Sequence, residues 1–222
     1  MRIVAVADTH LFHENGYLVP DGDMLIHAGD LCRRGTLEEL AVACAWLRAL
    51  PHATKVVVAG NHDWAFIREP AEARSMLQDV GAIYLEDSGT MLGGLRFWGS
   101  PWQPAYNDWA FNLPRGAPLA ERWSLIPDGL DVLVTHCPPA GIGDTTEMAG
   151  RQGCADLRAR VAVIEPRLQL FGHIHNDGGA WREGTTQFAN VTSWECSRAP
   201  TVIEIDRDRI EMVSVPSGEW TR

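Results

Sequence analysis

Five short polar motifs in this sequence each follow a run of apolar residues, and their side chains are of the kinds that bind metal ions. Each apolar run has the length and composition of a buried parallel strand. Loops at the carboxyl ends of such strands converge on one edge of a sheet, so we expect the polar side chains to lie together there. The motifs are Asp8-Thr9-His10, Gly29-Asp30, Gly60-Asn61-His62-Asp63, His136 and Gly172-His173-Ile174-His175.

The candidate ligands form a mixed oxygen and nitrogen set of two aspartates, one asparagine and four histidines. Such a set suits manganese, iron, zinc, cobalt or nickel and gives no reason to expect a thiolate site. Seven groups exceed what one tetrahedral ion uses, which indicates two ions roughly 3.5–4 Å apart that share one aspartate. Such a pair turns a trapped water into a bridging hydroxide nucleophile and clamps a phosphoryl group in line. The set is Asp8, His10, Asp30, Asn61, His136, His173 and His175.

His62 directly follows a candidate ligand and can therefore reach a substrate without binding metal. We expect it to be the catalytic imidazole, as proton donor to the leaving oxygen or as hydrogen-bond donor to a phosphoryl oxygen. Asp63 is expected to assist catalysis by orienting that imidazole through its second nitrogen.

The elements that must position these side chains can be read from the periodicity of the chain. Thr36 opens a capping box with Glu39, which predicts a helix from there to about residue 50, and Pro70 begins another that ends near residue 80. Further helices are expected at 119–125 and 155–164. The strands are expected at 2–7, 24–28, 56–59, 131–135 and 168–171, then a meander of 83–85, 90–92 and 95–98, and finally 186–191, 201–206 and 209–215.

Residues 100–116 lack the period of a helix or strand and are rich in proline and aromatic residues. Long ordered loops of this kind are usually lids or binding loops. Trp102, Asn107 and Trp109 are therefore candidates for substrate binding by stacking or hydrogen bonding. The same side chains could equally anchor the loop to the core.

Composition limits the class of protein. The chain has 222 residues, is 45% hydrophobic and carries a net charge of −10, with no basic stretch, so a duplex nucleic-acid surface is disfavoured. No apolar run approaches the length of a membrane span. The five cysteines are dispersed and no secretory leader is recognisable, which favours a cytoplasmic protein with free thiols. We expect a single domain over residues 1–222.

Together the five motifs resemble the calcineurin-like metallophosphoesterase superfamily. Further segments resemble its metallophosphoesterase-domain-containing subfamily: 85–88 (LEDS), 99–104 (GSPWQP), 111–116 (FNLPRG) and 125–129 (LIPDG). The resemblance implies an α/β fold, a β-sandwich flanked by helices on both sides. It also implies that Asp8, His10 and His175 bind one metal, that Asn61, His136 and His173 bind the other, and that Asp30 bridges them.

The resulting hypothesis is a dinuclear metal-dependent phosphohydrolase, most simply a phosphodiesterase acting on small phosphodiesters such as cyclic nucleotides. The alternatives are a phosphomonoesterase, a nucleotide pyrophosphatase, a nuclease or a non-catalytic nucleotide-binding or scaffold protein. Other residues have plainer interpretations. His27 is expected to be a core histidine, His13 and His52 surface or loop residues, and Cys137 a small packing residue. Arg33, Arg34 and Arg151 are either phosphate-binding or ordinary surface arginines.

Overall fold

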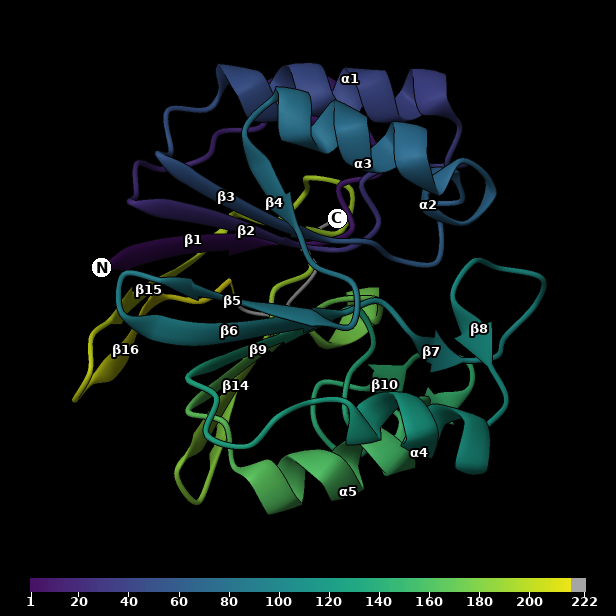
Figure 1. The fold of residues 1–222 in the computed structure, drawn as a ribbon. Coiled ribbons are helices and arrows are strands. Elements are labelled where there is room, and N and C mark those ends of the chain that lie inside the picture. The colour runs from purple at the N-terminus through teal and green to yellow at the C-terminus, as the bar shows by residue number, and fades with distance from the viewer. Residues whose placement is uncertain (217–222) are drawn as a thin grey trace.

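The computed structural model describes residues 1–216, whose strands form two six-stranded mixed sheets (Figure 1). Each sheet contains four adjacent parallel strands. In the first sheet these are β1-β2-β3-β4, and the two strands with antiparallel pairing both lie on the β1 side; in the second they are β14-β12-β9-β6, with one antiparallel strand at each edge. The first sheet runs in the order β16 (Ile210–Ser214), β15 (Thr201–Ile205), β1 (Arg2–Val6), β2 (Met24–Ala28), β3 (Thr54–Val58), β4 (Ala82–Tyr84). The second runs in the order β13 (Gly179–Glu183), β14 (Thr186–Asn190), β12 (Leu168–Phe171), β9 (Val132–Thr135), β6 (Leu95–Ser100), β5 (Ser88–Leu92).

Helices cover the outer face of each sheet, which confirms the predicted α/β fold with helices on both sides. The first sheet is covered by α1 (Leu37–Ala49), α2 (Ala65–Arg68) and α3 (Pro70–Asp79), and the second by α4 (Ala117–Ser124) and α5 (Ala155–Ile164) (Figure 1). Thr36 caps α1 as predicted, since its hydroxyl accepts a 3.3 Å hydrogen bond from the Glu39 N–H. The Glu39 carboxylate accepts from the N–H groups of Arg33, Arg34 and Gly35, so the reciprocal half of the capping box is replaced by bonds to the preceding loop.

Three apolar layers hold these elements together, because successive side chains of a strand point to opposite faces and both faces are covered. In β1, Ile3 and Ala5 face the core between the two sheets, together with Val132 and Leu170. Alternate residues such as Val4 pack under α1 and α3. A third core lies between the second sheet and α4 and α5. Because both faces of the parallel strands are buried, these strands read as continuous apolar runs in the sequence.

The predicted meander over 83–98 is wrong. Strand β4 pairs in parallel with β3 in the first sheet, whereas β5 and β6 form an antiparallel hairpin in the second sheet. The chain therefore crosses from one sheet to the other between Tyr84 and Ser88. The alternation of apolar residues indicates a short strand but not the strand with which it pairs. The sequence pattern therefore did not distinguish a three-stranded meander from strands that belong to two different sheets. Sequence periodicity also missed α2 and β13.

Two histidines predicted to be surface or loop residues are buried. His13 stacks on Trp46 with 4.5 Å between ring centroids, and it is 5% exposed. His52 is 2% exposed, and its Nε2 lies 3.1 Å from the carbonyl oxygen of Pro20. His13 lies in the short 3-10 helix η1 (Phe12–Asn15) between β1 and β2, and His52 lies in the loop between α1 and β3, so both are outside the strands and long helices yet buried.

The long loop between β6 and α4 is closed by a two-stranded ladder. Strand β7 (Gln103–Pro104) pairs in parallel with β8 (Asn112–Leu113), and the Ala110 N–H donates to the carbonyl oxygen of Asn61 at 3.0 Å. A second small ladder, β10 (Thr145–Thr146) with β11 (Gly150–Arg151), lies in the loop before α5. Among the described residues, none of the helices is long and apolar enough to cross a membrane.

Candidate metal centre

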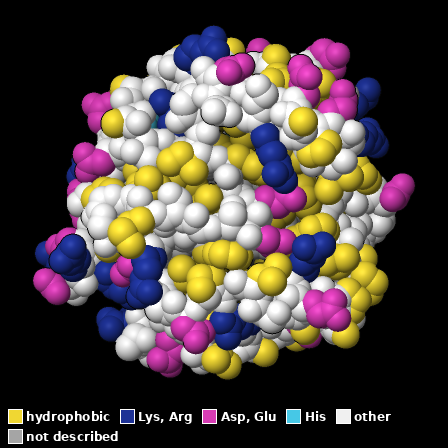
Figure 2. Space-filling view, viewed as in Figure 1, with side chains coloured by type: hydrophobic (Ala, Val, Ile, Leu, Met, Phe, Trp, Pro, Cys, Tyr) yellow, Lys and Arg dark blue, Asp and Glu magenta, His cyan; other side chains and the backbone are white. Residues whose placement is uncertain are grey.

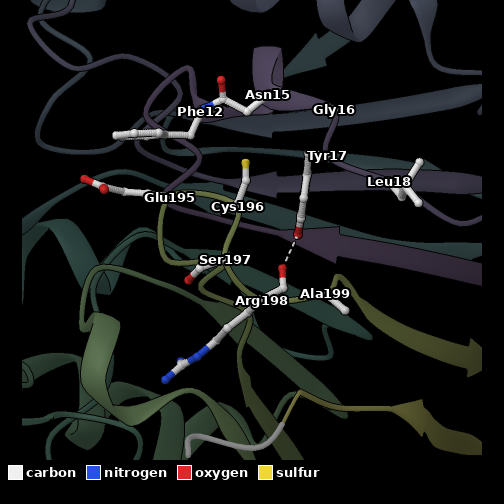
Figure 3. A pocket seen from close by; sticks show the side chains of 10 residues that line it. All are labelled: Phe12, Asn15, Gly16, Tyr17, Leu18, Glu195, Cys196, Ser197, Arg198 and Ala199. Atoms are coloured by element: carbon white, nitrogen blue, oxygen red, sulfur yellow. Dashed lines mark hydrogen bonds between the residues drawn. The ribbon is translucent and has the colours of Figure 1, made fainter. Parts of the chain in front are cut away.

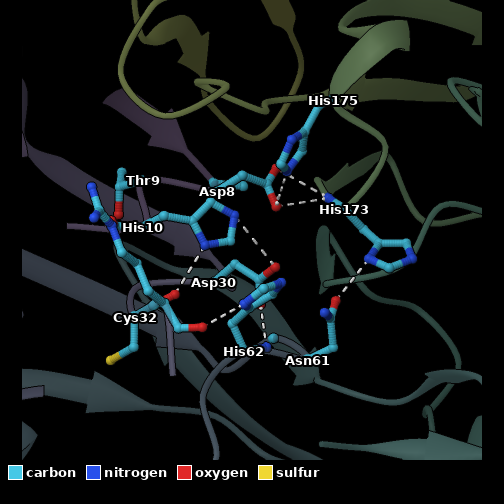
Figure 4. A network of polar contacts seen from close by, with 12 residues as sticks. Asp8, Thr9, His10, Asp30, Cys32, Asn61, His62, His173 and His175 are labelled. Atoms are coloured by element: carbon cyan, nitrogen blue, oxygen red, sulfur yellow. Dashed lines mark hydrogen bonds and ion pairs between the residues drawn. The ribbon is translucent and has the colours of Figure 1, made fainter. Parts of the chain in front are cut away.

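All seven candidate ligands follow the carboxyl ends of parallel strands and come together in one polar cluster. Figure 4 labels six of them: Asp8, His10, Asp30, Asn61, His173 and His175. The two sheets are joined at this edge. The Ala7 N–H donates to the carbonyl oxygen of Val191 at 3.0 Å, and the Ser193 N–H donates to that of Ala7 at 2.8 Å. Loops from both sheets therefore contribute to a single centre, as expected for ligands bound at the carboxyl edge of an α/β sheet.

The backbone of the centre is strained. Four ligands have positive backbone φ angles, between 44° and 68°, a region that residues other than glycine rarely occupy: Asp8, His10, Asp30 and His173. Such outliers cluster at functional sites, where the surrounding structure enforces them. The four ligand side chains are thus placed at a cost in conformational energy, which indicates that their direction matters.

Two of the ligands, Asp30 and Asn61, are each preceded by a glycine because a larger side chain would not fit there. A Cβ on Gly60 would lie 2.3 Å from Oδ1 of Asp30, and a Cβ on Gly29 would lie 2.3 Å from Nδ1 of His136. Ligand side chains from the neighbouring strand end, Asp30, and from the second sheet, His136, fill the space that a larger residue would need. The Gly-Asp and Gly-Asn pairs in the sequence therefore reflect close packing of the ligands.

One group of ligands surrounds Asp8. Its Oδ1 lies 3.6 Å from Nε2 of His175, at the start of the short 3-10 helix η2 (His175–Asp177). His10 adds a third side chain, and the ligand atoms of these three residues all lie within 4.8 Å of one another. Nδ1 of His10 is 2.9 Å from the carbonyl oxygen of Cys32, so this nitrogen carries the proton and Nε2 is left to bind a metal.

The other group surrounds the side-chain oxygen of Asn61. It lies 3.0 Å from Nε2 of His136 and 2.8 Å from Nδ1 of His173. Nδ1 of His136 is held 2.9 Å from the carbonyl oxygen of Ala28, which again leaves Nε2 facing the cluster.

Asp30 lies between the two groups. Its Oδ2 is 3.7 Å from Nε2 of His10 and 3.4 Å from Nε2 of His136. These separations exceed a hydrogen bond. They match two ligand atoms that each lie about 2.1 Å from a common ion at a tetrahedral angle and are thus about 3.4 Å apart. The donor set, its spacing and its fixed imidazole orientations therefore fit a pair of metal ions.

The charges of the centre are balanced between buried carboxylates and imidazoles. Burial by itself opposes charge on both partners, yet the His136 imidazole and its neighbours hold the pKa of Asp30 well below its usual range. Asp30 in turn raises the pKa of His136 to about 9, against the effect of burial. A bound cation would replace the proton of His136, since metal ligands must be deprotonated.

His62 lies at the open side of the centre. Its backbone N–H donates to Oδ1 of Asp30 at 2.8 Å, and its Nδ1 lies 2.7 Å from the carbonyl oxygen of Arg33. That contact places the ring proton on Nδ1 and leaves Nε2 available. The ring packs between His10, with centroids 4.6 Å apart, and Trp109, at 4.1 Å. The position suits a group that acts beside the metals.

Asp63 does not make the contact with His62 that the sequence analysis predicted. Its buried carboxylate accepts backbone N–H bonds at 2.8–3.3 Å from Gly60, Asp30, Leu31 and Cys32. The physical reason is that two ligand-bearing loops meet here and leave several amides without partners, which one carboxylate satisfies. Asp63 thus holds the loops after β2 and β3 together, and it orients His62 only through that backbone.

The three candidate substrate-binding residues in the loop 100–116 differ in position. Trp102 donates from Nε1 to Oδ2 of Asp87 at 2.7 Å and lies under the guanidinium of Arg122, so it anchors the loop to the core. Asn107 is exposed, and its carbonyl oxygen accepts from the Asn112 side chain within the same loop. Of the three predicted substrate-binding residues, Trp109 is the one in ring contact with the centre, through His62.

Sequence reasoning missed the pocket in front of the centre. It has a volume of about 340 Å³ and is lined by His10, Phe12, Arg33, His62, His175 and Glu195. Phe12 and Glu195 carry no motif, and Glu195 lies near the other end of the chain from His10, Phe12 and Arg33. The proximity of Arg33 to the strand-end motif Gly29-Asp30 was the one available indication.

Comparison with known proteins identifies the class. Residues 1–177 match the family model described as calcineurin-like phosphoesterase, so the chain belongs to this family. Members are metal-dependent phosphoesterases, and the clustered ligands fit that chemistry. The protein is accordingly a phosphoric ester hydrolase by family.

Particular relatives narrow the comparison. The chain is 37% identical over 235 aligned positions to metallophosphoesterase domain-containing protein 1 of Homo sapiens, which covers 94% of this chain and 72% of the relative. The fold is similar to TT1561 of Thermus thermophilus (TM-score 0.63, 16% identity, 95% of this chain and 96% of that one). It is also similar to a structure described as a novel archaeal phosphodiesterase (TM-score 0.51, 12% identity, 97% and 99%).

Proposed function

We propose that this protein is a dinuclear metal-dependent phosphodiesterase that acts on small diesters such as cyclic nucleotides. Asp8, His10 and His175 would hold the first ion. Asn61, His136 and His173 would hold the second, and Asp30 would be the ligand shared by both. The observation that carries the assignment is the position of one Asp30 oxygen between the imidazoles of His10 and His136.

When bound, the metal pair supplies an activated water and clamps the phosphoryl oxygens of the substrate. The chain itself supplies the remaining functions. His62 lines the pocket, and with both ring nitrogens protonated it can donate the Nε2 proton to the leaving oxygen while its Nδ1–H stays bonded to the Arg33 carbonyl oxygen. The hydrogen bond from its backbone N–H to Asp30 fixes the distance between this imidazole and the centre.

The pocket in front of the centre supports an organic ester as substrate. Its volume of about 340 Å³ exceeds what a phosphate ion alone needs, and it is at the size at which small-molecule pockets begin. Arg33 adds a cation at its edge, which favours the negative charge of a phosphoryl group.

The surface supports a small substrate over a nucleic acid duplex. The net charge is −10, and on the face shown in Figure 2 the lysine and arginine side chains are interspersed with aspartate and glutamate. A duplex-binding surface requires a continuous basic patch.

The test is hydrolysis of bis-p-nitrophenyl phosphate, 3′,5′-cyclic AMP and p-nitrophenyl phosphate by protein loaded separately with manganese, iron, zinc, cobalt or nickel. Turnover of the diesters above that of the monoester supports the proposal. Turnover of the monoester alone would assign a phosphomonoesterase, and tight nucleotide binding without turnover would assign a binding protein.

A further inference from the structure

A carboxylate faces the pocket in front of the metal centre, although the phosphoryl chemistry proposed above does not use it. Glu195 lines this pocket opposite three imidazoles and Arg33. Within the protein its negative charge acts on the His175 imidazole. A carboxylate also repels a phosphoryl group, so a substrate group that Glu195 binds must lie on the part of the substrate that is not phosphate.

Glu195 is placed by a strained backbone. Trp194, Glu195 and Cys196 have positive φ of 41°, 55° and 62°, three consecutive left-handed residues without a glycine. Left-handed conformation costs roughly 1–2 kcal/mol per residue for side chains other than glycine. The turn is fixed to the centre, because the Glu195 N–H donates to the carbonyl oxygen of Asp8 at 2.9 Å. Strain of this kind, held next to a reactive centre, indicates a functional position.

A second pocket adjoins the first at the same two side chains. It has a volume of about 310 Å³, and Phe12 and Glu195 line both pockets (Figure 3). Its remaining walls mix apolar, hydroxyl and amide groups with one cationic residue, Arg198. They come from the loop after β1 and the loop before β15: Asn15, Gly16, Tyr17, Leu18, Cys196, Ser197, Arg198 and Ala199. A substituent on a phosphoryl group at the metals would pass between Phe12 and Glu195 to reach this second pocket.

Each pocket has an arginine whose position is fixed. The Arg33 guanidinium lies over the Phe12 ring at 4.0 Å, and its Nε donates to the carbonyl oxygen of His10 at 2.9 Å, so this cation lies on the metal side, next to the phosphoryl position. The Arg198 guanidinium of the second pocket lies over the Trp194 ring. The Glu195 carboxylate between the pockets can only accept hydrogen bonds, and its two oxygens can accept from the two hydroxyl groups of a vicinal diol.

We infer that Glu195 is a specificity residue that accepts hydrogen bonds from hydroxyl groups on the ester substituent of the substrate. The substituent is a vicinal diol of glyceryl or ribosyl type, and it runs past Phe12 toward the second pocket. This inference rests on the proposed function, since it takes the phosphoryl group to lie at the metal centre.

The test measures binding, so that it does not depend on turnover. Calorimetry on manganese-loaded protein compares 3,4-dihydroxybutylphosphonate with n-butylphosphonate, which differ only in the diol and cannot be hydrolysed. Adenosine 5′-phosphate against its 2′,3′-dideoxy analogue tests the ribosyl source. The variants are Glu195→Ala and the isosteric Glu195→Gln, with Glu72→Gln on the exposed face of α3 as the matched control. Metal content is measured for each.

The wild type is expected to bind the diol of at least one pair about tenfold more tightly than its deoxy partner, the range of a hydrogen bond to a charged group. The preference for the glyceryl or the ribosyl pair identifies the source. Glu195→Ala should abolish the preference, Glu195→Gln should reduce it, and Glu72→Gln should retain it.

Equal binding of both members of each pair by the wild type would overturn the inference, and so would a preference that survives in Glu195→Ala. Hydrolysis of bis-p-nitrophenyl phosphate by the same wild-type sample separates the two claims. Turnover without a diol preference refutes the role of Glu195 alone, whereas a diol preference without turnover refutes the phosphodiesterase and supports the site.

Discussion

The backbone N–H of His62 donates to Oδ1 of Asp30, while Oδ2 of the same carboxylate faces the imidazoles of His10 and His136. One side chain thus links the group proposed for acid catalysis with both halves of the candidate metal centre. Because the bond to Asp30 comes from the His62 backbone, the side chains of Asp30 and His62 can be altered separately and their roles tested one at a time.

Asp30→Ala is expected to lose both metal ions and all phosphoesterase activity, because it removes the one ligand shared by the two halves. The measurement is metal content by atomic emission on dialysed protein, together with turnover of bis-p-nitrophenyl phosphate. Asp21→Ala, in an exposed loop, is the control. Two ions retained in Asp30→Ala would show that Asp30 is not the bridge.

His62→Ala is expected to keep both metals and to slow turnover roughly 10²–10⁴-fold, the usual contribution of general acid–base catalysis. The backbone bond to Asp30 does not need the imidazole, so the centre should be preserved. Metal content and kcat are compared on the same preparation. A parallel loss of metal would make His62 a ligand instead of a proton donor.

Asp63→Ala is expected to lower the free energy of unfolding by about 3 kcal/mol or more, since buried amides left without a partner cost about 1–3 kcal/mol each. Four N–H groups donate to this carboxylate, from two loops. Asp63→Asn retains one acceptor oxygen and should lose less. Urea unfolding of metal-free protein measures both, and a change under about 1 kcal/mol in Asp63→Ala, less than one unpaired amide costs, would contradict the structural role.

The motifs at the strand ends made most of the fold and the candidate metal centre predictable. Each motif indicates, from its local sequence alone, a strand and the edge of the sheet at which its polar side chain lies. Val56 to Ala59 followed by Gly60-Asn61 specifies a buried parallel strand and a ligand at its carboxyl end, whatever the rest of the chain does. The same reasoning placed Thr36 at the start of α1.

The remainder depended on tertiary contacts that leave no local pattern. Nothing in the sequence around His13 indicates that it stacks on Trp46. Glu195 reaches the centre through left-handed residues at positions where no glycine marks the turn. The partners of Asp63 are backbone amides, which every sequence contains. For the same reason, the pairing of β4 with β3 could not be read from two short apolar strands.

The buried His13 predicts a loss of stability in mild acid. Burial lowers the pKa of His13 to about 4, from 6.5 in the unfolded chain. Between these values the unfolded chain binds a proton that the folded chain does not, so stability falls as the pH drops from 6.5 toward 4. One such proton contributes a slope of at most about 1.4 kcal/mol per pH unit.

His13→Gln should therefore flatten the dependence of unfolding free energy on pH between 6.5 and 4. Glu14→Gln, on the exposed side of the same short helix, is the control. Urea unfolding at several pH values in the presence of chelator gives the slopes. A slope in His13→Gln equal to that of the wild type would mean that His13 does not titrate on unfolding.

The most direct test of the dinuclear phosphodiesterase is a titration of metal-free protein with manganese, in which bound metal and turnover of bis-p-nitrophenyl phosphate are followed on one sample. The account predicts saturation at two ions per chain, with diester turnover that appears as the second ion binds. Saturation at one ion, or full activity with one ion bound, would contradict it.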